Sequence, residues 1–150
     1  MYVSGTFETG MRWDVRTESG HTYVCDAMEK HGGNNEGASP MELVLVGLCG
    51  CTGMDVVQIL RKRRVDISHF RIQVTADRVP TDPRVFSNIL LVYTVGGRGV
   101  TEDAVRFAVE LSVEKYCSVM AILRKSARIT YRIECHSVAD DVVAESAALA

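Results

Sequence analysis

The sequence predicts one α+β domain, and three observations lead to this prediction. The apolar stretch over residues 43–57 has the length and uniformity of a buried helix. Residues 70–77 alternate apolar and polar side chains, as does the segment 128–135, and this period of two is typical of strands with one buried face. We therefore expect antiparallel sheets packed around a long buried central helix.

Composition and charge narrow the class of protein. A length of 150 residues with 47% apolar residues fits a single domain, 1–150, with a real core, and no linker divides it. The net charge of -2 gives no electrostatic reason to expect nucleic acid or an anionic membrane as partner. Because no secretion signal precedes the first polar stretch, we expect a cytoplasmic protein with its five cysteines reduced.

The first third of the chain predicts short strands, a loop and then the central helix. Residues 1–26 contain two turn signals between short alternating segments, and residues 31–38 are too rich in turn formers for regular structure. Ser39 is a good helix N-cap, and Glu42 completes a capping box with it. The predicted helix runs to about Arg63. Since it is apolar on nearly all sides, it needs to be enclosed on all sides, and we expect a second copy of the chain to cover it in a homodimer.

The remaining elements follow from the same rules. After the strand at 70–77 comes a second strand at 88–95, which ends at two glycines. Helical spacing then predicts a helix over 102–115 capped by Thr101, a break near Tyr116, and a short helix over 118–125. The last strand is the one at 128–135. From Val138 the tail is alanine-rich and acidic, and we expect a frayed helix or disorder there.

Two cysteines stand in positions where chemistry is possible. Cys51 lies in the central helix among three glycines, each of which costs about 1 kcal/mol relative to alanine in a helix interior and so needs a reason. Cys117 stands where a new helix starts, and a helix N-terminus lowers the pKa of a thiol. The two thiols form a reversible disulfide if the fold brings their Cα atoms within about 7 Å. From spacing alone, small buried hydrophobes remain the better interpretation.

An ordered set of motifs resembles a known family. The set consists of Gly32-Gly33, Ser39-Pro-Met-Glu-Leu43, Gly50-Cys-Thr-Gly-Met-Asp-Val-Val57 and Glu114-Lys-Tyr-Cys-Ser-Val119. In this order and at these separations it resembles the OsmC/Ohr family of thiol-dependent hydroperoxide reductases, most closely its YhfA-like branch. The resemblance covers residues 32–135. It implies an intertwined α+β homodimer with two active sites at the subunit interface.

The resemblance also implies a reaction. Cys51 corresponds to the peroxidatic cysteine, which forms a sulfenic acid, and Cys117 to the resolving cysteine, which then forms a disulfide with it. An external dithiol, which in the family can be a lipoyl-type donor, restores both thiols. Apolar walls favour an organic hydroperoxide as substrate. No metal, flavin or other cofactor is implied.

Activation of Cys51 is the point at which this sequence departs from the family. Characterised members use an arginine from the N-terminal strands, held by a glutamate directly after the proline of the central helix. Here that position is Met41, and the glutamate falls one place later, at Glu42, which the capping box already explains. Arg12 and Arg16 are the candidate arginines, and Arg16 is preferred. An exposed strand arginine is an equally good interpretation of either residue.

Other interpretations remain open beside this one. Cys49 and Cys51, with Cys25, Cys135 and His136, suggest a metal site, but side chains two residues apart on a helix point about 200° apart, which disfavours one shared ion. A non-catalytic protein of the same fold, binding a small hydrophobic molecule at the dimer interface, is the main alternative to the peroxidase, and Met41 favours it. A dimer whose cysteines only pack is the third hypothesis.

Overall fold

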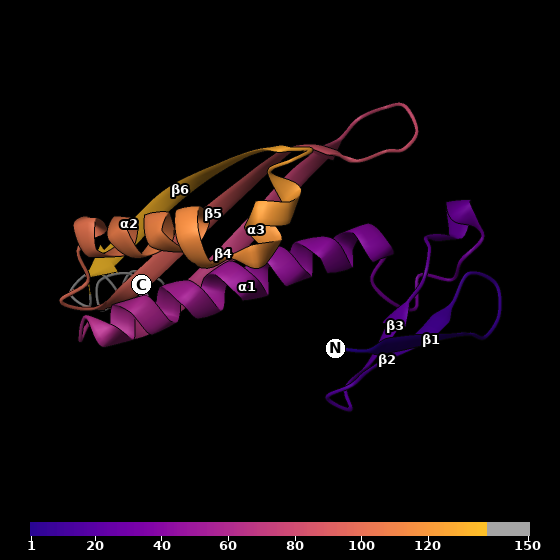
Figure 1. The fold of residues 1–150 in the computed structure, drawn as a ribbon, viewed down its shortest axis with the longest axis horizontal. Coiled ribbons are helices and arrows are strands. Elements are labelled where there is room, and N and C mark those ends of the chain that lie inside the picture. The colour runs from indigo at the N-terminus through magenta and orange to yellow at the C-terminus, as the bar shows by residue number, and fades with distance from the viewer. Residues whose placement is uncertain (138–150) are drawn as a thin grey trace, which may run out of the picture. The chain divides into compact units, whose positions relative to one another are not determined.

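The computed structural model describes residues 1–137, and the predicted fraying of the tail from Val138 lies outside these residues. The chain forms two compact units, the first ending at Val46 and the second beginning at Gly47. The elements are labelled in Figure 1. Whether the chain acts as the single domain expected from its sequence stays a prediction.

The first unit is a small antiparallel sheet followed by a tied loop. Its strands are β1 (Val3–Phe7), β2 (Trp13–Thr17) and β3 (Thr22–Cys25), in the order β1-β2-β3. A short 3-10 turn, η1 (Glu29–His31), opens the loop. The buried Asp26 carboxylate organises this loop, because it accepts backbone N–H bonds from Ala27, Asn34 and Glu36 at 2.7, 2.9 and 3.1 Å. These bonds, with that of Glu36 as the largest cause, lower the pKa of Asp26.

The long helix α1 (Pro40–Lys62) begins where the capping box predicts. The Ser39 N–H donates to the Glu42 carboxylate at 2.8 Å, and the Glu42 N–H donates to the Ser39 hydroxyl at 3.4 Å. The predicted end at Arg63 is one residue too long. Of the three glycines in the apolar run, Gly53 has a clear packing reason: a Cβ there would stand 3.1 Å from the Ile72 side chain.

The second unit contains a three-stranded sheet with α1 packed on it. Its strands are β4 (Asp66–Arg78), β5 (Phe86–Arg98) and β6 (Arg128–Ser137), in the order β4-β5-β6. β4 and β5 are antiparallel, as expected, but β6 runs parallel to β5, which corrects the expectation of purely antiparallel sheets. The physical reason is the long helical crossover between β5 and β6, which returns the chain to the starting end of β5.

The crossover contains three helical segments. They are α2 (Glu102–Leu111), capped by Thr101 as predicted, the π turn η2 (Ser112–Tyr116), and α3 (Ser118–Leu123). The predicted break near Tyr116 is present, but the regular helix before it ends at Leu111 because the π turn follows. Figure 1 shows α1 and α2 on the same side of the sheet. The core between these layers is made of the fully buried residues Leu48, Val56, Leu60, Ile89, Leu91, Val95, Val105, Ala108 and Val109.

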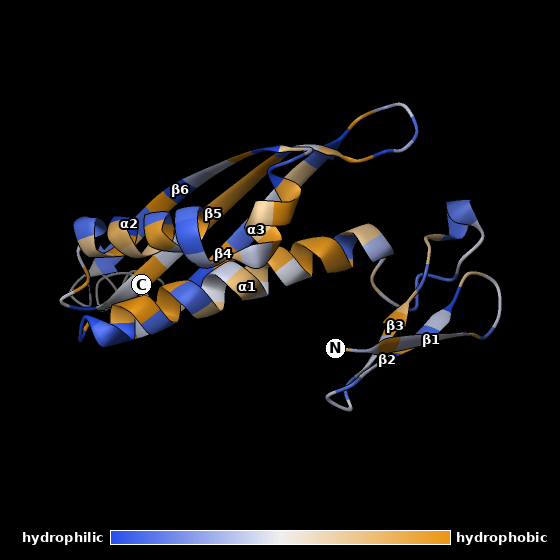
Figure 2. Cartoon of the chain, in the orientation of Figure 1, coloured by the Kyte–Doolittle hydropathy of each residue, from blue (hydrophilic) through white to orange (hydrophobic). Residues whose placement is uncertain are grey.

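The central helix is only partly covered by the described part of its own chain. Figure 2 shows that apolar residues occupy much of its length, yet only 28% of its most apolar 18-residue window is buried. By length and composition alone α1 is also able to cross a membrane, a property that it shares with core helices of soluble proteins. Residues 1–137 of one chain therefore do not enclose the helix on all sides.

Candidate functional site

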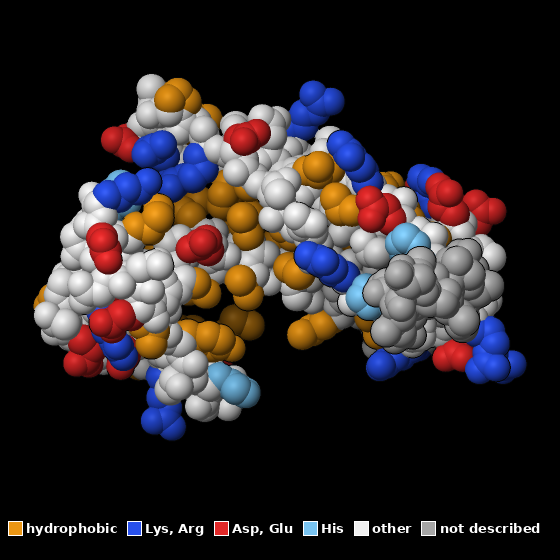
Figure 3. Space-filling model, turned by 180° about the vertical axis from the view of Figure 1, so that it is seen from behind, with side chains coloured by type: hydrophobic (Ala, Val, Ile, Leu, Met, Phe, Trp, Pro, Cys, Tyr) orange, Lys and Arg blue, Asp and Glu red, His pale blue; other side chains and the backbone are white. Residues whose placement is uncertain are grey.

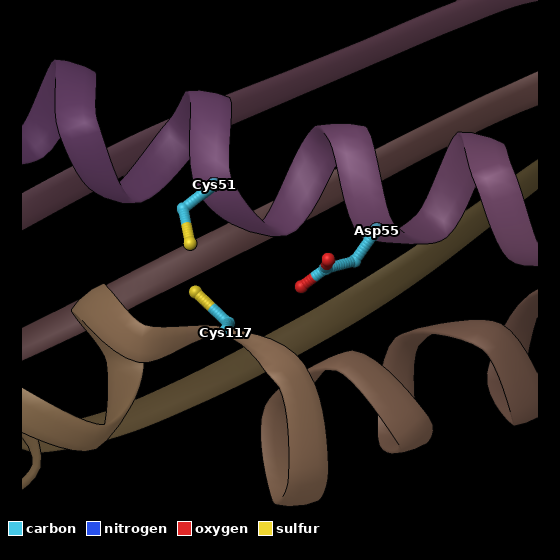
Figure 4. Close-up of side chains that lie close together, drawn as sticks. All are labelled: Cys51, Asp55 and Cys117. Carbon is cyan, nitrogen blue, oxygen red and sulfur yellow. The ribbon is translucent and has the colours of Figure 1, made fainter.

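Three chemically reactive side chains of the second unit meet beside α1. Cys51 and Asp55 are four residues apart on the helix and so share one face. Cys117 comes from the residue before α3 and faces them, as Figure 4 shows. The two Sγ atoms and a carboxylate oxygen of Asp55 all lie within 4.8 Å of one another. The fold thus brings together the two cysteines selected from the sequence and adds a carboxylate that was not selected.

The π turn places Cys117 at this point. The Cys117 N–H donates to the carbonyl of Ser112 at 2.9 Å, five residues back, which closes the wide turn at the end of α2. Cys117 then serves as N-cap of α3, and its Sγ accepts the N–H of Met120 at 3.3 Å. The expected position at a helix start is therefore confirmed.

The expected lowering of the Cys117 pKa is wrong. Cys117 is only 3% exposed, and burial raises the pKa of its thiol to about 11. The N–H of Met120 acts in the opposite direction but is too weak to compensate. Cys51 and Asp55 raise the Cys117 pKa further. Burial and a neighbouring carboxylate thus outweigh the helix terminus.

A chain of hydroxyl groups holds the Asp55 carboxylate. The Ser112 hydroxyl donates to Asp55 Oδ2 at 3.0 Å and lies 3.1 Å from the Thr52 hydroxyl, which in turn lies 2.7 Å from the Tyr93 hydroxyl. Ser112, Thr52 and Tyr93 are fully buried. Burial is the main reason that the pKa of Tyr93 is raised to about 12. Each hydroxyl of this buried chain has a partner, which makes it a rigid support for Asp55.

Sequence reasoning missed this chain for a simple reason. The four-residue spacing of Cys51 and Asp55, with Thr52 inside an apolar run, was a usable signal of a shared polar face. Ser112 and Tyr93 carried no comparable signal, because they join the site only through the packing of η2 and β5 against α1.

The predicted arginine and glutamate belong to the first unit. Arg16 lies on β2, paired with Ser4 and Thr22, and lines a concavity of about 500 Å³ on the β1–β3 sheet. Arg12 forms ion pairs with Asp14 and Glu36.

Glu42 caps α1, and its hydrogen bonds to Ser39 lower its pKa. The geometry thus accounts for Glu42 as a capping residue. The catalytic roles of Arg16 and Glu42 stay predictions.

Cys49 is turned away from the reactive cluster. Its Sγ lies 3.9 Å from the carbonyl oxygen of Ile72 on β4, and burial raises the pKa of its thiol. Cys51 instead faces Cys117, as expected for two side chains about 200° apart on a helix. Within residues 1–137, the fold assembles one cluster of metal-ligating side chains, which consists of Cys51, Asp55 and Cys117. Of the metal-site group suggested by the sequence, only Cys51 belongs to this cluster.

Comparison with known proteins agrees with this architecture. A family model described as "OsmC-like protein" matches residues 32–132. "Protein YhfA" of Escherichia coli strain K12 is 38% identical over 125 residues, which cover 83% of this chain and 90% of that protein.

Two solved structures illustrate the range of the likeness. A hypothetical protein from Aquifex aeolicus is similar with a TM-score of 0.80 and 29% identity, over 91% of this chain and 96% of that one. An organic hydroperoxide resistance protein OsmC from Legionella pneumophila has the same fold, with a TM-score of 0.66 and 12% identity over 89% and 97% of the two chains. The family match over residues 32–132 and the identity to YhfA lead to one conclusion: the chain belongs to the OsmC/Ohr family of OsmC-like proteins, and to its YhfA-like part.

Proposed function

We propose that this chain is a thiol-dependent peroxidase that reduces organic hydroperoxides to alcohols through Cys51 and Cys117. The observation that carries the proposal is the approach of the two Sγ atoms to within 4.8 Å, from separate elements, with both cysteines free. Support of a coarser kind comes from the family, since the similar Legionella pneumophila protein is named for organic hydroperoxide resistance.

The reaction follows from the chemistry of the two thiols. The Cys51 sulfur attacks one oxygen of the O–O bond, the alcohol leaves with the second oxygen and a proton, and Cys51 becomes a sulfenic acid. The Cys117 sulfur then attacks the Cys51 sulfur, water leaves, and a disulfide forms. An external dithiol reduces this disulfide by exchange and is itself oxidised to a disulfide. Cys51 is the more accessible of the two cysteines, which suits the sulfur that meets the substrate.

A homodimer is part of the same proposal. The second unit exposes large apolar side chains on two helices, with Met54 of α1 76% exposed and Ile122 of α3 66% exposed. Figure 3 shows apolar side chains at the surface of one face of the molecule. A partner subunit that covers these side chains also supplies apolar walls to the site. We further propose that the protein is cytoplasmic.

One observation favours the second candidate, a non-catalytic protein that binds a small hydrophobic ligand at the dimer interface. A peroxidatic thiol needs a nearby cation to ionise. Within residues 1–137, the charged group that lies within 4.8 Å of both sulfurs is the Asp55 carboxylate. Met41 in the place of the family glutamate points in the same direction. In this candidate Cys51 has a structural role or is a slow redox sensor.

The decisive experiment measures consumption of cumene hydroperoxide by the reduced protein in the presence of a dithiol. We expect turnover that Cys51→Ser abolishes, whereas Cys117→Ser retains one round of reaction and leaves a sulfenic acid that dimedone traps. Cys49→Ser is the matched control, since Cys49 is also on α1 but faces β4, and it should behave as the wild type. Turnover that persists in Cys51→Ser excludes the proposed mechanism, and its absence from the wild type leaves the binding protein and the dimer whose cysteines only pack.

A further inference from the structure

Asp55 is a half-buried neighbour of both thiols, and the proposed peroxidase reaction does not use it. Its carboxylate and the two sulfurs are three metal-ligating groups from two separate elements, all within 4.8 Å of one another. Thiolate sulfur with a carboxylate oxygen is a ligand set that zinc accepts, whereas calcium and magnesium require oxygen ligands.

We propose that Cys51, Asp55 and Cys117 bind one zinc ion in the reduced protein. Zinc–sulfur bonds of about 2.3 Å in a tetrahedral site separate two sulfur ligands by about 3.8 Å, so ligands now within 4.8 Å reach the ion through side-chain rotation without movement of the helices. Three protein ligands leave a fourth position open for water or another donor, as in zinc sites that are not purely structural.

The hydroxyl chain provides the outer support that such a site requires. Metal-bound carboxylates are held by hydrogen bonds from neighbouring groups, which fix the orientation of the ligand. The Ser112 hydroxyl donates to Asp55 Oδ2, and among residues 1–137 no side chain hydrogen-bonds to Oδ1, which can therefore face an ion. Thr52 and Tyr93 fix Ser112 in turn. All three supporting residues are fully buried, so the carboxylate is oriented before an ion arrives.

Charge favours a cation at the same point. All three ligands are anionic when deprotonated, and over residues 1–137 no lysine or arginine lies within salt-bridge distance of Asp55. The Cys117 sulfur already accepts the N–H of Met120 at 3.3 Å, which supports it as a thiolate ligand. A divalent ion balances two of the three charges.

The test uses the reduced, metal-free full-length protein. Titration with Co²⁺ should produce the near-ultraviolet sulfur-to-metal charge-transfer band of thiolate ligands, with one ion per chain, and Zn²⁺ should displace the Co²⁺ and abolish the band. Competition with a chromophoric chelator then gives the Zn²⁺ affinity. We expect Cys51→Ser and Cys117→Ser each to remove about half of the band, and Asp55→Asn to weaken Zn²⁺ binding at least tenfold.

Two controls make the result decisive. Cys49→Ser should leave the Co²⁺ band and the Zn²⁺ affinity unchanged, because its sulfur faces β4. Ser112→Ala keeps all three ligands but frees the carboxylate, and it should weaken Zn²⁺ binding about tenfold, a test that stands if Asp55→Asn does not fold. A wild type without the band, or an affinity that none of these variants changes, overturns the proposal.

The zinc proposal is separable from the proposed peroxidase. Metal binding is measured without peroxide, and disulfide formation by cumene hydroperoxide is measured without metal. Asp55→Asn should lose tight zinc binding and still form the Cys51–Cys117 disulfide.

Discussion

Burial and the neighbouring Cys51 and Asp55 determine how easily Cys117 ionises. A thiolate within 4.8 Å of a carboxylate is disfavoured by repulsion, and burial disfavours it further. The proposed peroxidase requires a cation beside Cys51, the role that the resemblance implies for Arg16. Such a cation separates the proposed peroxidase from the binding protein.

The neutral state of Cys117 makes the stability of the fold depend on pH. The thiol pKa rises from 9.0 to about 11 on folding, so between these values the unfolded chain has released a proton that the folded chain retains. Stability from this group is complete below pH 9 and is lost as the pH rises toward 11. We expect the free energy of unfolding, measured in urea at pH 8, 9 and 10, to fall less steeply with pH in Cys117→Ala than in the wild type. Equal slopes in the two proteins would contradict the burial argument.

At the scale of one element, the start of α1 separates two roles of Glu42. If Glu42 is only a capping residue, Ser39→Ala and Glu42→Gln each weaken the capping box and cost about 1 kcal/mol of stability with little effect on peroxide turnover. If Glu42 also holds the activating arginine, Glu42→Gln lowers turnover at least tenfold and Ser39→Ala does not. From the observed bonds to Ser39 we expect the first result, measured by urea unfolding and by the cumene hydroperoxide assay on the same samples.

Elements with strong local rules were predictable from the sequence. Ser39, Glu42 and Thr101 identified two helix starts, because caps are local hydrogen-bonding patterns that need no tertiary contact. The alternation in β4 was equally local. The direction of β6 was not predictable in this way, because it depends on how the crossover through α2 and α3 packs.

Some residues of the candidate site were predictable from the sequence and others were not. Cys51 and Cys117 were selected because their motifs are ordered along the chain, and the structure places their sulfurs together. The Asp55, Ser112 and Tyr93 support arises from three elements that meet only in the folded state, so no spacing rule joins them. The prediction for the pKa of Cys117 was wrong because it considered the helix N-terminus and not the burial of the thiol.

At the scale of the whole molecule, α1 keeps apolar side chains exposed that the described part of one chain does not cover. Met54 is 76% exposed, although α1 belongs to the core of the second unit through Leu48, Val56 and Leu60. Full burial of a methionine side chain contributes about 1.5–3 kcal/mol to stability, and an exposed methionine does not make this contribution. A second copy that packs on this surface is the arrangement that the sequence predicts.

Introducing charge on this surface should therefore separate the subunits without unfolding them. Met54→Lys places an ammonium where the proposed dimer buries apolar surface, and we expect at least a hundredfold weaker dimerisation, measured by sedimentation equilibrium over a range of protein concentrations. The far-ultraviolet circular dichroism should be retained. Gln73→Lys, at an exposed polar position of β4, is the control and should leave the dimer intact. A wild type that is monomeric at micromolar concentration would contradict the dimer itself, and a Met54→Lys dimer of unchanged affinity would place the partner elsewhere. Either result would remove the apolar interface from the proposed site.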